Sequence, residues 1–159
     1  MIFVTVGQML GFDRLIQAMD LWAKAHPERE VFAQIGDGRY APSAIPWTRM
    51  IPPVEFKGKA ASAELIVAHA GMGSYFTAME AQKPIVMLAR LEARQEHTTD
   101  HQVHTLKWLR EKPGVYAADN EDQLPGQIER ALADTTAFDT FSRFAPAALV
   151  ANLRQAILS

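Results

Sequence analysis

The order of segments along the chain predicts an α/β protein with a doubly wound, mostly parallel sheet of about six strands. Short apolar runs alternate with segments in which apolar residues recur every three or four positions. The connections between them are short, and this alternation is typical of parallel sheets covered by helices on both faces. The sequence has no repeats, low-complexity tracts or linkers, so residues 1–159 are expected to form a single domain.

Apolar runs predict the strands. Each run is short, contains β-branched or other apolar side chains, and is followed by a glycine, a proline or a polar residue. In order, the predicted strands are IFVTV (2–6), VFAQIG (31–36), a weak strand near TRMI (48–51) that Pro52 and Pro53 stop, LIVA (65–68), IVML (85–88) and VYAA (115–118).

Helical periodicity and helix-breaking residues predict the segments between the strands. In order, the predicted helices are residues 12–22, closed by Pro27; a short segment at about 55–64; 74–82, ended before Pro84; 99–112, stopped by Pro113 and Gly114; a helix capped by Asp119 or Asn120 that runs to about Asp134; and a last helix within 141–158 that starts or breaks near Pro146.

Composition excludes several classes of function. Hydrophobic residues make up 48% of the 159 residues and charged residues 21%, which is typical of a folded globular protein. The net charge is −2 and no run of Lys or Arg appears, so nucleic acid is not an expected partner. The chain has no cysteine, which excludes disulfides and thiolate chemistry. The apolar start lacks a basic flank and no run approaches ~20 residues, so we expect a cytoplasmic protein.

The stretch HAGMGS follows a predicted buried strand and opens a predicted helix. Gly71 and Gly73 allow a ligand to approach the backbone, and the first N–H groups of the helix can bind an anion. Ser74 adds a hydroxyl and His69 an imidazole. On the residues alone, a plain strand-to-helix turn with Ser74 as a cap is an equally good reading, because a short glycine motif is weakly specific.

A second glycine-bearing loop, VGQMLG, follows the first strand and contains Gly7, Gln8 and Gly11. Ligands of parallel sheets bind where the carboxyl ends of strands meet. Two such loops on neighbouring strand ends can hold two sides of one phosphate group. Taken alone, this second loop is better explained by ordinary turn chemistry.

The polar segment EARQEHTTDHQVH contains three histidines. His97, His101 and His104 are four and three residues apart, so on a helix they share a face, and this spacing leaves a zinc site open. We expect no metal, because no acidic or cysteine partner cluster appears elsewhere. The alternative is that Asp100, His101 and Gln102 bind a polyhydroxyl ligand at the helix start. Arg90 and Arg94 can pair with phosphate or carboxylate, or lie in a solvated loop.

Taken in order, these stretches resemble the C-terminal, nucleotide-sugar-binding half of a GT-B glycosyltransferase of family 28, a Rossmann-like domain. The resemblance covers nearly the whole chain. It is carried by MIFVTVGQ…FDRLIQAMDLWA, VFAQIG, AELIVAHAGMGS, KPIVMLAR and EHTTDHQVHTLKWL. The chain is most similar to the small stand-alone subunits of two-component UDP-sugar transferases of bacterial exopolysaccharide assembly. The eukaryotic dolichol-linked N-acetylglucosaminyltransferase subunit is a more distant relative.

The resemblance implies roles for individual residues. His69, Gly71 and Ser74 match the His-x-Gly-x-x-Ser element that holds the donor diphosphate, with His69 and Ser74 as the catalytic pair. Gly7 and Gln8 match the first glycine loop near the same phosphates. His101 and Gln102 match the pair that contacts the sugar hydroxyls. Gln34, Gly36 and Phe56 lie where the uracil base is bound.

One position departs from the family pattern. The family has a Glu three residues after the serine, where the carboxylate binds the ribose hydroxyls. Here that residue is Thr77, and the nearest acid is Glu80, one turn further on. Either Glu80 takes over this role or the ribose is held more weakly.

The resemblance implies inverting transfer of a sugar from a UDP-sugar to a lipid-linked acceptor, with no cofactor besides the donor. A GT-B site needs a second domain, for which this chain has no room. The expected partner is therefore a membrane-associated, acceptor-binding subunit that brings the chain to the cytoplasmic face of a membrane, with the apolar last helix as its docking surface. Two other functions stay open: a nucleotide-binding regulatory module and a metal-dependent hydrolase.

Overall fold

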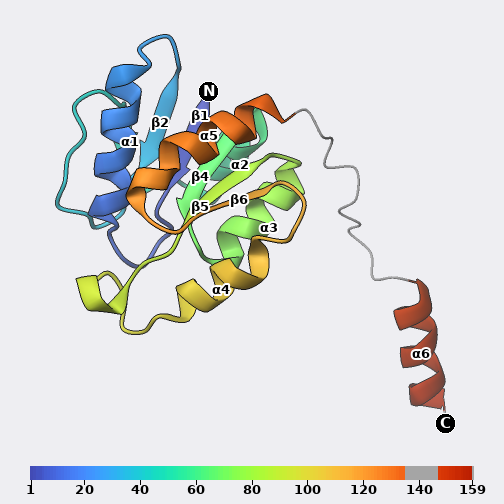
Figure 1. The fold of residues 1–159 in the computed structure, drawn as a ribbon. Coiled ribbons are helices and arrows are strands. Elements are labelled where there is room, and N and C mark those ends of the chain that lie inside the picture. Colours follow the sequence, from blue (N-terminus) through green and yellow to red (C-terminus); the bar gives the residue numbers. More distant parts are fainter. Residues whose placement is uncertain (135–146, 159) are drawn as a thin grey trace.

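The computed structural model describes residues 1–134 and 147–158 and contains one six-stranded, wholly parallel sheet (Figure 1). The spatial order is β3-β2-β1-β4-β5-β6. The strands are β1 (Ile2–Thr5), β2 (Val31–Gln34), β3 (Trp47–Thr48), β4 (Leu65–His69), β5 (Ile85–Leu88) and β6 (Val115–Ala118). From β1 the chain adds β2 and β3 on one side of the sheet, and it then crosses back to add β4, β5 and β6 on the other side of β1. The predicted α/β, doubly wound architecture is confirmed.

Helices cover both faces of this sheet. They are α1 (Asp13–Ala25), α2 (Pro53–Ser62), α3 (Met72–Ala81), α4 (His101–Leu109), α5 (Leu124–Ala133) and α6 (Ala147–Leu158), with short 3-10 turns η1 (Glu92–Arg94) and η2 (Glu121–Gln123). Buried residues of α1 and α5 join one hydrophobic cluster, and those of α2, α3 and α4 join the other. The strand sequence explains this division, because successive side chains of a strand point to opposite faces.

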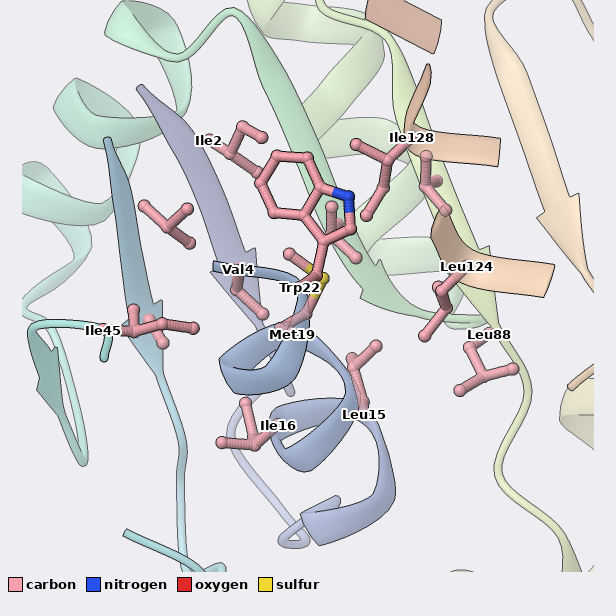
Figure 2. Packing of buried hydrophobic residues seen from close by; sticks show 14 of the residues in the cluster. Ile2, Val4, Leu15, Ile16, Met19, Trp22, Ile45, Leu88, Leu124 and Ile128 are labelled. Atoms are coloured by element: carbon pink, nitrogen blue, oxygen red, sulfur yellow. The ribbon is translucent and has the colours of Figure 1, made fainter. Parts of the chain in front are cut away.

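The two apolar clusters form the core. In β1, Ile2 and Val4 belong to the cluster under α1 and α5, whereas Phe3 belongs to the opposite one. Figure 2 shows the first cluster, with Trp22 of α1 lying over β1 and close to Ile128 of α5. Both clusters consist mainly of aliphatic side chains that are almost fully buried. The strands are thereby fixed, and so are the loops that leave their carboxyl ends.

Several predicted boundaries differ from the structure by a few residues, including those of the third strand and of helices α3 and α4. The weak third strand was expected at 48–51 but consists of Trp47–Thr48, because Trp47 pairs with Ala33 and the chain turns away soon after. Helix α3 begins at Met72 rather than at residue 74. Helix α4 is shorter than the predicted 99–112, beginning at His101 after Asp100 and ending at Leu109.

The last helix, α6, begins directly after Pro146, as predicted, and every residue of it that the structure describes is exposed. Its apolar residues Leu149, Val150, Leu153 and Ile157 are 44–80% exposed. Phe141 and Phe144, which the sequence assigned to the same docking surface, lie outside the described residues. None of the described residues of α6 is buried, so this helix does not pack on the sheet.

Candidate functional site

A groove of about 1010 Å³ lies between α2 and α3, at the carboxyl ends of β1, β2 and β4. This is the point where the strand order reverses, which is where open parallel sheets bind their ligands. The groove brings together nine of the predicted site residues. They are Gly7, Gln8, Gln34, Phe56, His69, Gly73, Ser74, Thr77 and Glu80.

His69 and Ser74 form a hydrogen-bonded pair at the end of β4. The Ser74 hydroxyl lies 3.2 Å from His69 Nδ1, and α3 has no side-chain cap, so Ser74 contacts the imidazole rather than capping the helix. Burial, and after it the nearby positive charge of Arg90, lower the pKa of His69 to about 4, although a hydrogen bond to the Thr5 backbone acts in the opposite direction. The imidazole is therefore neutral near pH 7.

The glycines around His69 make room for its ring. A Cβ on Gly71 would lie 2.4 Å from His69 Nε2, and one on Gly7 would lie 2.7 Å from His69 Cε1. Gly7 also has a φ of +79°, a conformation that favours glycine. Gly73 is different, because a Cβ there would meet nothing within 4 Å. Of these three glycines, only Gly73 therefore has the open surroundings that the approach of a ligand to the backbone requires.

The first turn of α3 offers unbonded N–H groups to the groove. Tyr75 is the first residue of the helix whose N–H bonds to a carbonyl of the preceding turn, that of Gly71. The N–H groups of Met72, Gly73 and Ser74 have no hydrogen-bond acceptor in the part of the chain that the structure describes. Free N–H groups and the positive end of the helix dipole favour an anion here.

A small network fixes the neighbouring strand ends. The Thr5 hydroxyl donates to Gln34 Oε1 at 3.0 Å, and the Gly7 N–H donates to the Thr5 hydroxyl at 3.2 Å. Gln34 Nε2 in turn donates to the Gly7 carbonyl at 3.4 Å. Thr5 and Gln34 are register partners in the sheet, so β1 and β2 place the network beside His69. Gln34 is 1% exposed and its groups are used to hold the Gly7 backbone.

The walls of the groove carry Thr77 and Glu80 on α3 and Lys57 on α2. The Thr77 hydroxyl donates to the Gly73 carbonyl at 2.9 Å, so its proton is already used within the helix. The lining residues that were not predicted from the sequence are Lys57, Thr5, Ile51, Pro53, Ala60, Ala61 and Ala81. For the four on α2, the signal was the three- and four-residue spacing of 53, 57, 60 and 61 on the helix that also carries Phe56.

Six predicted residues do not line the groove: Gly36, Gly71, Arg90, Asp100, His101 and Gln102. Gln102 is 3% exposed, and its Oε1 accepts from the Arg90 N–H at 3.1 Å. Asp100 Oδ1 accepts from the Glu92 N–H at 2.8 Å, and the His101 Nδ1 lies 2.9 Å from the Thr99 hydroxyl. These side chains therefore support the loops beside the groove.

The two arginines predicted to meet an anion are both engaged within the protein. Arg90 is 3% exposed and donates to the carbonyls of Val6 and Leu10. Arg94 donates to Glu121 Oε1 at 2.7 Å. Arg90 is buried and Arg94 does not line the groove, so neither guanidinium is placed to pair there with the carboxylate of a uronate donor.

Two of the three histidines of the polar segment, His97 and His101, lie in contact with each other. The rings of His97 and His101 lie edge to face, 4.4 Å apart. Over the described part of the chain, the structure holds no group of three or more His, Cys, Asp or Glu side chains with metal-binding geometry. The hydrolase alternative therefore has no preformed centre there.

The fold is similar to solved glycosyltransferases. The glycotransferase of kitacinnamycin gives a TM-score of 0.63 at 15% identity over 87% of this chain, and the spinosyn forosaminyltransferase SpnP gives 0.62 at 16% over 99%. The glycosyltransferase SnogD from Streptomyces nogalater gives 0.57 at 21% over 87%. The chain spans 36–44% of the length of these proteins and matches their Rossmann-like, C-terminal GT-B domain.

A search of curated protein sequences found no match. A family comparison did find one, because residues 1–149 match the glycosyltransferase family 28 C-terminal domain. This match contains all fifteen predicted site residues, the groove and both glycine-bearing loops. The chain therefore belongs to the glycosyltransferase family 28 C-terminal domain family.

Proposed function

We propose that this chain is the donor-binding and catalytic subunit of a heteromeric, inverting glycosyltransferase that moves a sugar from a UDP-sugar to a lipid-linked acceptor in polysaccharide biosynthesis. The observation that carries the proposal is the groove at the point where the strand order reverses. There the unbonded N–H groups of α3 lie beside the His69–Ser74 pair. A nucleoside diphosphate has both the charge and the length to occupy such a groove.

In this proposal the diphosphate binds at the first turn of α3. The N–H groups of Gly73 and Ser74 and the Ser74 hydroxyl stabilise the negative charge that grows on the departing UDP, which lowers the barrier to transfer. His69 is neutral near pH 7 and orients the Ser74 hydroxyl. The apolar lining from Ile51, Pro53 and Phe56 provides a surface for the uracil base.

Two exposed apolar surfaces support a partner subunit. Large apolar side chains surround the carboxyl edge of the sheet, and they are Met9, Met50, Val54, Met72 and Phe76, each 36–86% exposed. The second surface is α6. The GT-B proteins that this fold resembles are more than twice as long, so a further domain opposite the groove is consistent with both surfaces.

The partner would also bring the chain to its acceptor. None of the described helices is long and apolar enough to cross a bilayer. A lipid-linked acceptor lies at a membrane, so we propose that a membrane-associated subunit binds this acceptor and holds the chain at the cytoplasmic face. The reaction needs no cofactor besides the UDP-sugar in this proposal.

A reconstitution assay tests the proposal. Transfer of labelled sugar from UDP-sugars to lipid-linked acceptors is measured with the purified chain, with membranes containing the product of a neighbouring gene, and with both. Substantial turnover is expected only with both, because transfer requires donor and acceptor to be held together. Turnover by the chain alone would contradict the two-component proposal, and the absence of transfer in all three arms, over a full panel of UDP-sugars, would contradict the enzyme proposal.

A further inference from the structure

Arg90 connects the end of β5 to both ends of the loop that follows β1. Its Nη2 donates to the Val6 carbonyl at 2.7 Å and to the Leu10 carbonyl at 2.6 Å. These two carbonyls bracket residues 7–9, and Gly7 and Gln8 of this loop line the groove. One side chain therefore holds both ends of a groove-lining loop that lies more than 80 positions away in the sequence.

The cation is buried, and the negative charge of Glu96, which acts on it and raises its pKa, lies beyond ion-pair distance. Arg90 is 3% exposed, and among the described residues it forms no ion pair and its Nε has no hydrogen-bond acceptor. Burial lowers its pKa to about 10, so it remains charged near neutral pH. Burying such a charge is costly, and its contacts are backbone carbonyls and the face of Phe12, 5.1 Å from the guanidinium carbon. A charged side chain at this costly position indicates a specific role, and the two hydrogen bonds to the loop carbonyls are that role.

A second residue sets the position of Arg90. The Gln102 side chain, buried in α4, accepts from the Arg90 backbone N–H at 3.1 Å. On the other side, the loop that Arg90 holds is in close contact with His69, because a Cβ on Gly7 would lie 2.7 Å from the imidazole. A continuous chain of contacts thus runs from α4 through Arg90 and the loop to the His69–Ser74 pair.

We propose that Arg90 is a positioning residue of the donor site. It holds the loop of residues 7–10 in the conformation that forms one wall of the diphosphate-binding part of the groove, and it does not touch the donor. This inference rests on the proposed function, since it assumes that the groove binds UDP. A planar guanidinium suits the task, because its fixed fork contacts two carbonyls while its face packs on Phe12.

The test compares Arg90→Met and Arg90→Lys with the wild-type chain, using UDP and uridine as ligands. Arg90→Met keeps much of the side-chain volume but loses the charge and both hydrogen bonds. UDP affinity is expected to fall at least about tenfold, because the wall beside the diphosphate is no longer held. Uridine binding, followed by NMR, should change by less than about twofold, because the base does not contact this loop. Arg110→Met, which breaks an exposed ion pair with Asp119, is the matched control and should bind UDP as the wild type does.

The lysine variant separates positioning from charge alone. Arg90→Lys keeps the charge but lacks the planar fork, so UDP affinity should fall at least about fivefold, and the amide resonances of Gly7 and Gln8 should shift. Wild-type UDP affinity in either folded variant, or an equal loss of UDP and uridine binding, would overturn the inference. If Arg90→Met does not fold, Arg90→Lys decides by the same measurements. Failure of the wild-type chain to bind UDP would instead contradict the proposed function.

Discussion

At the scale of single residues, two of the glycines near His69, Gly7 and Gly71, make room for its ring, and a third, Gly73, lines the groove. Gly71→Ala is expected to destabilise the fold by about 1–3 kcal/mol, because its Cβ would displace the His69 ring. Gly73→Ala is the matched control for stability and should change the free energy of unfolding by less than about 1 kcal/mol, since its Cβ meets open space. Chemical denaturation measures both. Gly73→Ala should nevertheless weaken UDP binding, and equal destabilisation by the two variants would contradict this assignment.

His69 makes stability depend on pH in a defined window. Its pKa is lowered from an ordinary 6.5 to about 4, so the unfolded chain takes up a proton that the folded chain does not. The contribution to stability is complete above about pH 6.5 and is lost as the pH falls towards 4. It amounts to at most about 3 kcal/mol. Denaturation of the wild type and of His69→Gln between pH 4 and 8 measures it. A difference between the two that does not change with pH would contradict the lowered pKa.

In the proposed donor site, Thr77 stands at the position where the resemblance to family 28 predicts a carboxylate that binds the ribose. Because the Thr77 hydroxyl donates to the Gly73 carbonyl, we predict that the chain binds UDP and 2′-deoxy-UDP with affinities within about threefold. Thr77→Glu should then favour UDP by at least about tenfold, the value of one charge-assisted hydrogen bond. Thr77→Val is the control and should leave the ratio unchanged. A strong preference of the wild type for UDP would show that another group, with Glu80 the first candidate, binds the ribose hydroxyls.

At the scale of elements, strands were easier to predict than the contacts of the loops. β1, β4 and β5 are apolar on both sides, so their sequence specifies buried parallel strands without reference to neighbours. β3 has only two residues, and its position depends on pairing with β2, which local sequence does not encode.

In the candidate site, too, contacts between segments distant in the sequence were harder to predict than residues at the end of a strand. His69 and Ser74 were predictable because the stretch that contains them begins at the end of a buried strand, and the structure brings both to the groove. Arg90, which follows a strand, and Gln102, at a helix start, were predicted to bind the ligand, since polar residues at such places are ordinarily solvated or bind ligands. Their burial depends on carbonyls of Val6 and Leu10, which no local pattern connects to residue 90.

Helix α6 is the element with an apolar face and no described contact with the sheet. Leu149, Leu153 and Ile157 are four residues apart and share a face, on which we expect the partner subunit to dock. Leu153→Glu should abolish co-purification with partner-containing membranes while changing the free energy of unfolding by less than about 0.5 kcal/mol. Gln155→Glu, on the opposite face, is the control. Retention of the partner by Leu153→Glu, or a large loss of stability, would contradict this role.

At the scale of the whole molecule, the fold gathers the candidate site residues around the carboxyl edge of the sheet. The parallel sheet brings the ends of β1, β2 and β4 together, and the helix after β4 directs its N-terminus to the same place. We propose a division of labour between a donor-binding chain and an acceptor-binding partner because exposed apolar residues surround the site.

Calorimetric titration of UDP into the purified chain tests the central claim most directly. The account predicts saturable binding of one UDP per chain, and Ser74→Ala should weaken it by roughly 0.5–3 kcal/mol, the range between a neutral and a charge-assisted hydrogen bond. Chemical-shift changes on UDP binding should centre on the amides of Gly73 and Ser74. The absence of UDP binding by the wild-type chain, both alone and with its partner, would contradict the account.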